Sequence, residues 1–153
     1  MSQARGRVFQ QSGWSAVDGK RGSYANEIMA VDRESAARVL VVDDEHEIAS
    51  AMAEILADEG YSVAVAHDGL HAFEQIPRFD PDLILLDLMM PRMNGFEVLE
   101  RLREDRNRIP VVVVSANQGY DASDLKVAGK VRKPFALEQL LDAVTAALGM
   151  PAR

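Results

Sequence analysis

The chain has 153 residues, enough for one domain with a sizeable core, and its net charge of −7 argues against a basic nucleic-acid-binding surface. Residues 1–38 carry six Lys/Arg and four Asp/Glu, so the rest of the chain carries eleven against twenty and is the acidic part. There is no cysteine for disulfide or thiol chemistry, and no signal peptide or membrane-spanning stretch is recognisable. We therefore expect a cytoplasmic protein that binds neither nucleic acid nor a membrane.

The first 36 residues are rich in Gly, Ser, Gln and charged residues and show no sustained apolar period. This composition is typical of a flexible N-terminal extension, which we assign to residues 1–36. Two alternatives stay open. Met29 could be the natural start, which would make residues 1–28 an upstream artefact, or the segment could be a docking arm anchored by Trp14.

Residues 37–149 alternate between apolar runs typical of strands and amphipathic stretches typical of helices. The predicted strands are residues 39–42, 61–66, 83–86, 111–115 and 131–133. The predicted helices are residues 47–59, 70–76, 96–102 and 137–148, with at most a stunted helix within residues 120–128. Gly60 and Gly149 are expected to end helices, and Asn94 is the expected N-cap of the third. The alternation predicts an α/β domain with a doubly wound, five-stranded parallel sheet, followed by a tail at residues 150–153.

Polar side chains follow four of the apolar runs, at the point where each predicted strand ends. Asp43 and Asp44 follow the first run, Asp87 follows the third, Ser115 ends the fourth and Lys133 follows the fifth. The first, third and fourth runs are continuous rather than alternating, which predicts strands buried on both faces. Because the carboxyl ends of parallel strands form the ligand-binding edge of such a sheet, these five side chains are expected to meet there.

Three clustered carboxylates would repel one another, so the cluster requires a compensating cation. Oxygen ligands without cysteine or clustered histidine suit Mg²⁺ better than zinc, and Mg²⁺ held by carboxylates usually works on a phosphate. Lys133 and Ser115 could then pair with phosphoryl oxygens. An aspartate can form an acyl phosphate, and Asp87, at the centre of the predicted cluster, is the candidate nucleophile.

Four short motifs resemble the signatures of the receiver domain of two-component response regulators, over residues 37–149. They are Val41-Val42-Asp43-Asp44-Glu45, Asp87-Leu88-Met89-Met90-Pro91 with Asn94-Gly95, Val114-Ser115-Ala116, and Lys133-Pro134-Phe135. The resemblance implies the flavodoxin-like strand order 2-1-3-4-5. It also implies Asp87 as the phosphoacceptor and a magnesium site made by Asp44 and Asp87 directly, Asp43 through water and Met89 through its backbone carbonyl. Lys133 would be the family's invariant lysine, with a cis bond to Pro134, and Ser115 would take the place of the switch hydroxyl.

Two departures from the family pattern concern the output side of the domain. Lys130 stands three residues before Lys133, where the family commonly has a Tyr or Phe whose ring moves inward on activation. The span from Ser115 to Lys133 is also several residues shorter than usual, which implies a shortened fourth helix. The phosphorylation chemistry is expected to be intact, but the output surface is not expected to be the usual one.

The sequence thus predicts a stand-alone receiver that takes a phosphoryl group from a histidine kinase or histidine phosphotransfer protein and then alters the binding of a downstream protein target. It would be a switch with autophosphorylation and autodephosphorylation chemistry only, rather than a metabolic enzyme. The alternative is a phosphorylation-independent, receiver-like interaction module. A haloacid-dehalogenase-like phosphatase is excluded because its second Asp, two residues after the nucleophile, is here Met89.

Each candidate residue also has a structural explanation when it is taken alone. Asp43 and Asp44 could cap the first helix, Ser115 could merely end a strand, and Lys133 could be a solvated charge. Met89, Met90 and Met93 could be packing residues, and His46, His67 and His71 lack metal-ligand spacing and are assigned to surface or turn positions. The joint occurrence of the motifs at four strand ends favours the functional interpretation.

Overall fold

Five strands pair into one parallel sheet in the computed structural model, which describes residues 36–116, 119 and 122–149. The strands are β1 (Arg38–Val42), β2 (Ser62–Ala66), β3 (Leu83–Leu86), β4 (Val111–Ser115) and β5 (Gly129–Arg132). Their order is β2-β1-β3-β4-β5, and every neighbouring pair is parallel. The predicted α/β class and strand order are therefore confirmed.

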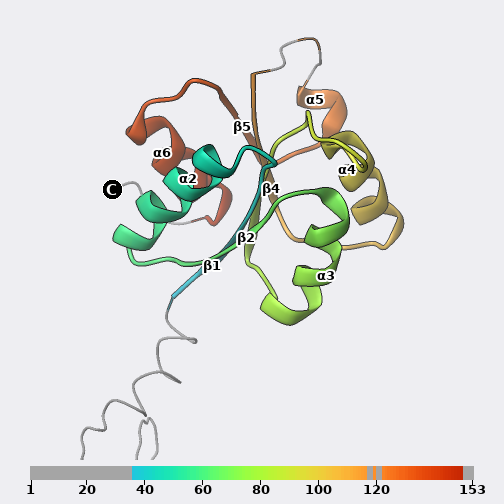
Figure 1. Cartoon of the computed structure of the whole chain (residues 1–153), viewed down its shortest axis with the longest axis horizontal. Coiled ribbons are helices and arrows are strands. Elements are labelled where there is room, and N and C mark those ends of the chain that lie inside the picture. The colour runs from blue at the N-terminus through green and yellow to red at the C-terminus, as the bar shows by residue number, and fades with distance from the viewer. Residues whose placement is uncertain (1–35, 117–118, 120–121, 150–153) are drawn as a thin grey trace, which may run out of the picture. The chain divides into compact units, whose positions relative to one another are not determined.

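The helices cover both faces of this sheet, as Figure 1 shows. They are α2 (His46–Asp58), α3 (Gly69–Phe79), α4 (Gly95–Glu104), α5 (Ala122–Leu125) and α6 (Leu137–Ala147), with labels as in Figure 1. The helices α2 and α6 lie on one face, and α3, α4 and α5 lie on the other. The chain therefore has the doubly wound arrangement that the alternating pattern predicts.

The two faces of the sheet bury separate hydrophobic clusters. Val39 and Val41 of β1 belong to the cluster that includes residues of α2 and α6, whereas Leu40 and Val42 belong to the cluster that includes residues of α3 and α4. Successive residues of a strand point to opposite faces, so a strand packed on both sides needs apolar residues at every position. This is why the β1, β3 and β4 sequences are continuous apolar runs.

Several predicted bounds differ from the structure by one to three residues. The helix predicted at 70–76 continues to Phe79 although Pro77, which lies inside it, removes one hydrogen bond of the helix, and the chain leaves the helix at Asp80 with φ 53°. The last strand spans Gly129–Arg132, so Lys133 lies just beyond it. The stunted helix expected within residues 120–128 is confirmed as α5, with four residues.

The expected helix ends are otherwise confirmed. Gly60 follows α2 with φ 97°, a conformation that side-chain-bearing residues rarely adopt, and its N–H donates to the carbonyl of Ala57. Asn94 caps α4 in a capping box, in which its side chain accepts from the N–H of Glu97 and the Glu97 carboxylate accepts from the N–H of Asn94.

The described compact unit begins at Arg38, beside the predicted domain start at residue 37. The predicted extension at 1–36 and tail at 150–153 lie outside the described residues, apart from residue 36, and stay predictions. In the part of the chain that the structure describes, no helix has the length and apolar composition needed to cross a membrane.

Candidate functional site

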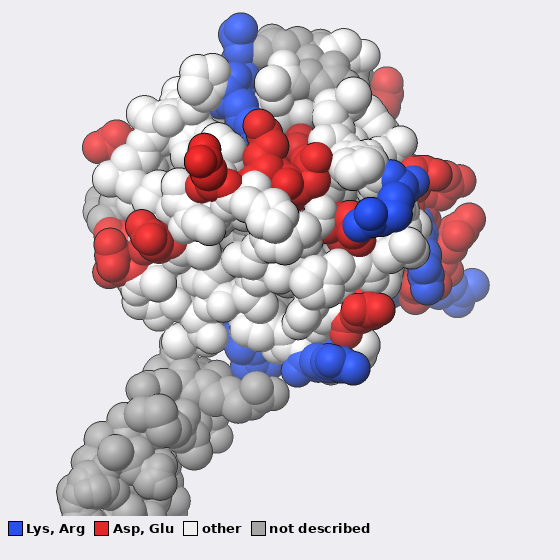
Figure 2. All heavy atoms as spheres, viewed as in Figure 1, with Lys and Arg blue, Asp and Glu red and all other residues white. Residues whose placement is uncertain are grey.

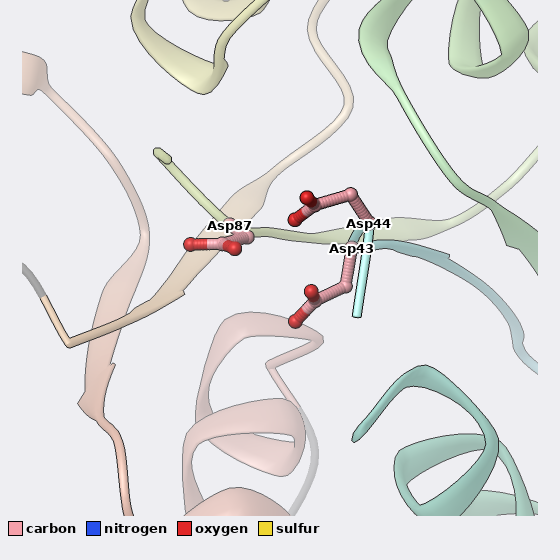
Figure 3. A group of neighbouring side chains, drawn as sticks. All are labelled: Asp43, Asp44 and Asp87. Atoms are coloured by element: carbon pink, nitrogen blue, oxygen red, sulfur yellow. The ribbon is translucent and has the colours of Figure 1, made fainter. Parts of the chain in front are cut away.

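Two buried aspartates lie at the carboxyl ends of adjacent strands in the middle of the sheet. Asp43 directly follows β1 and is fully buried, and Asp87 directly follows β3 and is 5% exposed. Backbone hydrogen bonds fix both, from Asp43 N–H to the carbonyl of Ala66 and from Asp87 N–H to the carbonyl of Val42, each 3.0 Å long. Asp44 completes the group, and Figure 3 shows the three carboxylates close together. Carboxylate oxygens of all three lie within 4.8 Å of one another.

Lys133 is the cation that this cluster contains. Its Nζ lies 2.7 Å from Oδ2 of Asp43, 2.8 Å from Oε1 of Glu45 and 3.5 Å from Oδ2 of Asp87. The lysine side chain is only 10% exposed, whereas that of Glu45 is 59% exposed. Glu45 is the residue of this site that the sequence interpretation missed, although it directly follows the two predicted metal ligands. Lys133 is therefore held closer to Asp43 and Glu45 than to Asp87.

The remaining predicted residues lie around the same pocket. Ser115, the last residue of β4, is buried, and its carbonyl accepts from the N–H of Lys133 at 3.1 Å. The N–H of Met89 donates to Oδ1 of Asp87 at 3.2 Å, and the Met89 side chain is exposed, so it is not a packing residue. The peptide bond between Lys133 and Pro134 is cis, as the resemblance implies. The structure thus brings together all the predicted site residues.

A glycine allows the helix that follows Asp87 to approach its backbone closely. A Cβ atom built on Gly95, the first residue of α4, would lie 2.4 Å from the carbonyl oxygen of Asp87 and 2.6 Å from Cα of Leu88. A Cβ atom built on Gly69, the first residue of α3, would lie 2.8 Å from the carbonyl oxygen of Met93, which is also too close. The chain from Asp87 to α4 is therefore packed against two helix starts that leave no room for a side chain.

Burial and charge act against each other at this site. Burial raises the pKa of Asp43, and repulsion by Asp87 adds to this, although hydrogen bonds from Lys133 and from the N–H of Glu45 oppose it. Burial alone would lower the pKa of Lys133, but the hydrogen bonds to Asp43 and Glu45 and the attraction of Asp87 together raise it. Lys133 therefore remains an ammonium group, and the site holds more carboxylates than this one cation balances. On the face seen in Figure 2, acidic side chains form a group near the upper middle.

The structure decides against one of the simpler explanations, that the aspartates cap a helix. The N-cap of α2 is Glu45, which makes no side-chain cap bond, so the suggestion that Asp43 or Asp44 caps this helix is wrong. Asp43 instead uses Oδ1 to accept from the N–H of Glu45 at 2.9 Å, which shapes the turn that leads from β1 into α2.

His46 is exposed and His67 lies in the bend after β2, as predicted, whereas His71 is a partly buried residue within α3. However, they gather beside the acidic site, which the sequence did not indicate. The His46 and His67 rings stack with centroids 3.8 Å apart, and Nδ1 of His67 lies 3.3 Å from the carbonyl oxygen of Asp43. Among the described residues, the group whose ligand atoms could share a metal is the aspartate trio.

The site fits a small, hard cation. The pocket has a volume of about 330 Å³ and is lined by two of the three aspartates, Glu45, Met89, Ser115, Ala116 and Lys133. Its lining residues carry carboxylate, hydroxyl and backbone carbonyl oxygens, which are the ligands that Mg²⁺ prefers. The fully buried position of Asp43, with one lysine for several carboxylates, is an arrangement that a divalent cation would stabilise.

Comparisons with known proteins agree with this geometry. Response regulator MprA of Mycobacterium avium is 40% identical over 118 residues, which are 72% of this chain and 50% of that protein, and MprA of Mycobacterium leprae is 39% identical over the same shares. The chain thus spans about half the length of the curated relatives it matches.

Solved structures show the same fold. Chemotaxis protein CheY4 of Vibrio cholerae aligns with a TM-score of 0.68 and 29% identity, covering 73% of this chain and 98% of that one. Response regulator protein TrrA of Thermotoga maritima, solved in complex with Mg²⁺-BeF, aligns with a TM-score of 0.66 and 32% identity, covering 71% and 96%. The family model of the response regulator receiver domain matches residues 39–145. The chain therefore belongs to the family of response regulator receiver domains.

Proposed function

We propose that this receiver domain accepts a phosphoryl group on Asp87 from a histidine kinase or a histidine phosphotransfer protein, and that the acyl phosphate changes the binding of a downstream protein target. The observation that supports this most strongly is the position of Asp87. Its carboxylate is buried at a strand end, beside two further aspartates and within 3.5 Å of Lys133. A carboxylate with neighbouring groups of both charges is suited to attack phosphorus.

Mg²⁺ would be held by Asp44 and Asp87 directly, by Asp43 through water and by the backbone carbonyl of Met89. When bound, it would neutralise charge that develops on the phosphoryl oxygens. The likeness to TrrA, which was solved with Mg²⁺-BeF, supports this assignment.

The protein's own residues orient the reaction. An oxygen of Asp87 forms the new bond to phosphorus while the bond from phosphorus to the donor histidine nitrogen breaks. The N–H of Met89 holds the other Asp87 oxygen and so fixes the carboxylate. Lys133 would exchange its contacts with Asp43 and Glu45 for a phosphoryl oxygen, and the Ser115 hydroxyl would donate to another. Autophosphorylation from small phosphodonors and autodephosphorylation are the chemistry proposed for the domain itself.

The whole protein's role is proposed on the same basis. Phosphorylation would act as a switch, since a new dianionic group at this edge would change the contacts of Ser115, which ends β4, and of Lys133, which directly follows β5. The proposed location remains the cytoplasm, as expected from the sequence.

Labelling of the full chain with acetyl phosphate and Mg²⁺ tests this function. Intact mass and Phos-tag electrophoresis should show one phosphoryl group on the wild type and none on Asp87→Asn. Asp82→Asn is a matched control, because Asp82 is an exposed aspartate just before the same strand, β3. Equal labelling of the wild type and Asp87→Asn would refute the assignment. If the wild type takes no label, the phosphorylation-independent interaction module becomes the better interpretation.

A further inference from the structure

A second, larger concave surface lies away from the acidic site. This groove has a volume of about 530 Å³ and is formed by the end of α4, the connection to β4, the start of β4 and residues 125–128. Pro110 and Val111 are at the amino-terminal end of β4, and Ala128 directly precedes β5. Ser115 and Lys133 are at the opposite, carboxyl ends of these two strands, so the groove and the acidic site are at different edges of the sheet.

The floor of the groove is apolar, and it is accessible because α5 is too short to cover it. The helices α2, α3, α4 and α6 have 10 to 13 residues, whereas α5 has four. Leu99, Leu102, Ile109, Leu125 and Val127 line the groove and belong to or pack against the hydrophobic cluster of this face. One end of that cluster is thus accessible from outside, through the groove between α4 and α5.

The rim of the groove is basic, although the domain as a whole is acidic. Arg103, Arg108 and Lys126 line it, and none of the described lining residues is acidic. Five of the eleven Lys/Arg that follow residue 38 lie between residues 101 and 126. Nearby acids lie outside the lining, and one of them, Asp105, pairs with Arg101 at 3.9 Å.

The three cations have different roles. Arg103 donates through Nη2 to the carbonyl of Leu125 at 3.1 Å, which ties the end of α4 to the end of α5 and holds the two walls together. Arg108 and Lys126 are exposed, and in the described part of the chain neither belongs to an ion pair. These two charges are therefore available to a partner.

We propose that this groove is a docking site for an acidic amphipathic helix of another protein. Apolar side chains of the partner helix, spaced one helical turn apart, would fill the groove, and flanking Asp or Glu residues of the partner would face Arg108 and Lys126. The N-terminal segment does not complement the groove, because residues 1–35 carry five Lys/Arg against four Asp/Glu. A nucleic acid would find no aromatic side chain for base stacking among the described lining residues.

Two designed peptides of about 16 residues, roughly four helical turns, test this proposal against the full chain without any phosphodonor. Both carry Leu on one face, one with Glu and the other with Lys at the remaining positions. Fluorescence anisotropy should show tighter binding of the Glu peptide. The comparison is stringent, because the net charge of −7 would favour the Lys peptide if attraction were non-specific.

Charge-reversal variants locate the binding. Arg108→Glu and Lys126→Glu should each weaken binding of the Glu peptide by about tenfold or more, whereas Arg78→Glu, the same change at an exposed position at the end of α3, should change it less than about twofold. Circular dichroism melts check that all three variants stay folded. Amide shifts on peptide binding should centre on Leu102, Ile109 and Val127.

Four results would overturn the proposal. One is equal or tighter binding of the Lys peptide, and another is an Arg78→Glu effect as large as that of Lys126→Glu. The third is a single-stranded oligonucleotide that binds the wild type but not Lys126→Glu, which would identify a nucleic acid as the occupant. The fourth is a dimer in sedimentation that Lys126→Glu abolishes, which would identify a second copy of the chain.

Discussion

The close approach of α4 to Asp87 predicts a strong effect of a very small substitution, Gly95→Ala. The added methyl group would lie 2.4 Å from the carbonyl oxygen of Asp87 and 2.6 Å from Cα of Leu88. These are backbone atoms, which cannot rotate away as a flexible side chain would. The N–H of Gly95 also donates to the carbonyl of Leu88 at 3.0 Å, so the helix cannot retreat without losing this bond. The chain at Asp87 must therefore shift.

The expected loss of stability on Gly95→Ala follows from two opposing contributions. Overpacking of this kind costs about 1–3 kcal/mol. Alanine favours a helix over glycine by about 1 kcal/mol in a helix interior, and the first position of α4 gains only part of this. We expect a net loss of about 1–2 kcal/mol, which lowers the melting temperature of a domain of this size by roughly 5–10 °C. A misplacement of about 1 Å at a reacting group can cost about 100-fold in rate, so we expect phosphorylation to slow by about tenfold or more.

Gly129→Ala is the matched control, because a Cβ atom there meets Cγ2 of Val112 at 3.5 Å, an ordinary contact. Thermal melts and time courses of labelling by acetyl phosphate would be recorded for both variants. Gly129→Ala should change neither quantity strongly. If Gly95→Ala melts and labels like Gly129→Ala, the close approach does not position Asp87, and the reasoning is refuted.

Two further predictions concern the acidic cluster. Asp44→Ala should abolish Mg²⁺ binding in calorimetry but leave the metal-free melting temperature unchanged or raised, because it removes one of three carboxylates within 4.8 Å; a large loss of stability would show a structural role instead. Burial raises the pKa of Asp43, so protons compete with Mg²⁺ above the usual range of an aspartate, and Mg²⁺ affinity should fall as the pH is lowered from about 7 to about 5. In the metal-free protein, stability should fall as the pH rises and Asp43 ionises, because burial raises the pKa of Asp43 in the folded state. An ordinary paired aspartate, whose pKa is lowered by folding, gives the opposite pH dependence. Affinity and stability that do not change over this range would contradict the role of burial.

The sequence predicts most of the fold because the strands are buried on both faces. Continuous runs such as Leu83–Leu86 can be recognised without knowledge of their neighbours, and the polar residues at their ends then fall on one edge of the sheet. The cluster of Asp43, Asp44, Asp87, Ser115 and Lys133 is a consequence of this topology. It needs no information on side-chain conformation.

Features that depend on side-chain conformation or on close approach could not be predicted in this way. Glu45 reaches Lys133 across 88 positions of the chain, and no pattern in the sequence distinguishes this glutamate from a solvated one. The same holds for Gly95, whose sequence context indicates a helix start but not its distance from Asp87. The groove between α4 and α5 arises from a helix of four residues, and its openness depends on how α4 ends.

Lys130 leads to a testable prediction about how phosphorylation of Asp87 changes the surface of the domain. It occupies the position where the family commonly has an aromatic ring that moves inward on activation. In the structure Lys130 is exposed on β5, and moving an ammonium group from water into an apolar interior costs several kcal/mol. Lys130 should therefore stay solvated in both states. The change should instead appear where β4 ends and where the short α5 replaces a full helix.

Amide shifts with and without Mg²⁺ and beryllofluoride measure this difference. We expect larger shifts for Ala116 and Leu125 than for Lys130. Lys130→Tyr is the informative variant, because it restores the family's residue type at the same exposed position. If the tyrosine ring can move inward on activation as the family's aromatic ring does, this variant should show larger shifts at residue 130 and in α6 than the wild type shows. Large shifts at Lys130 and α6 in the wild type, with Ala116 and Leu125 unchanged, would mean that a lysine takes the place of the ring, and that burial of an aromatic side chain is not what couples the chemistry to the surface.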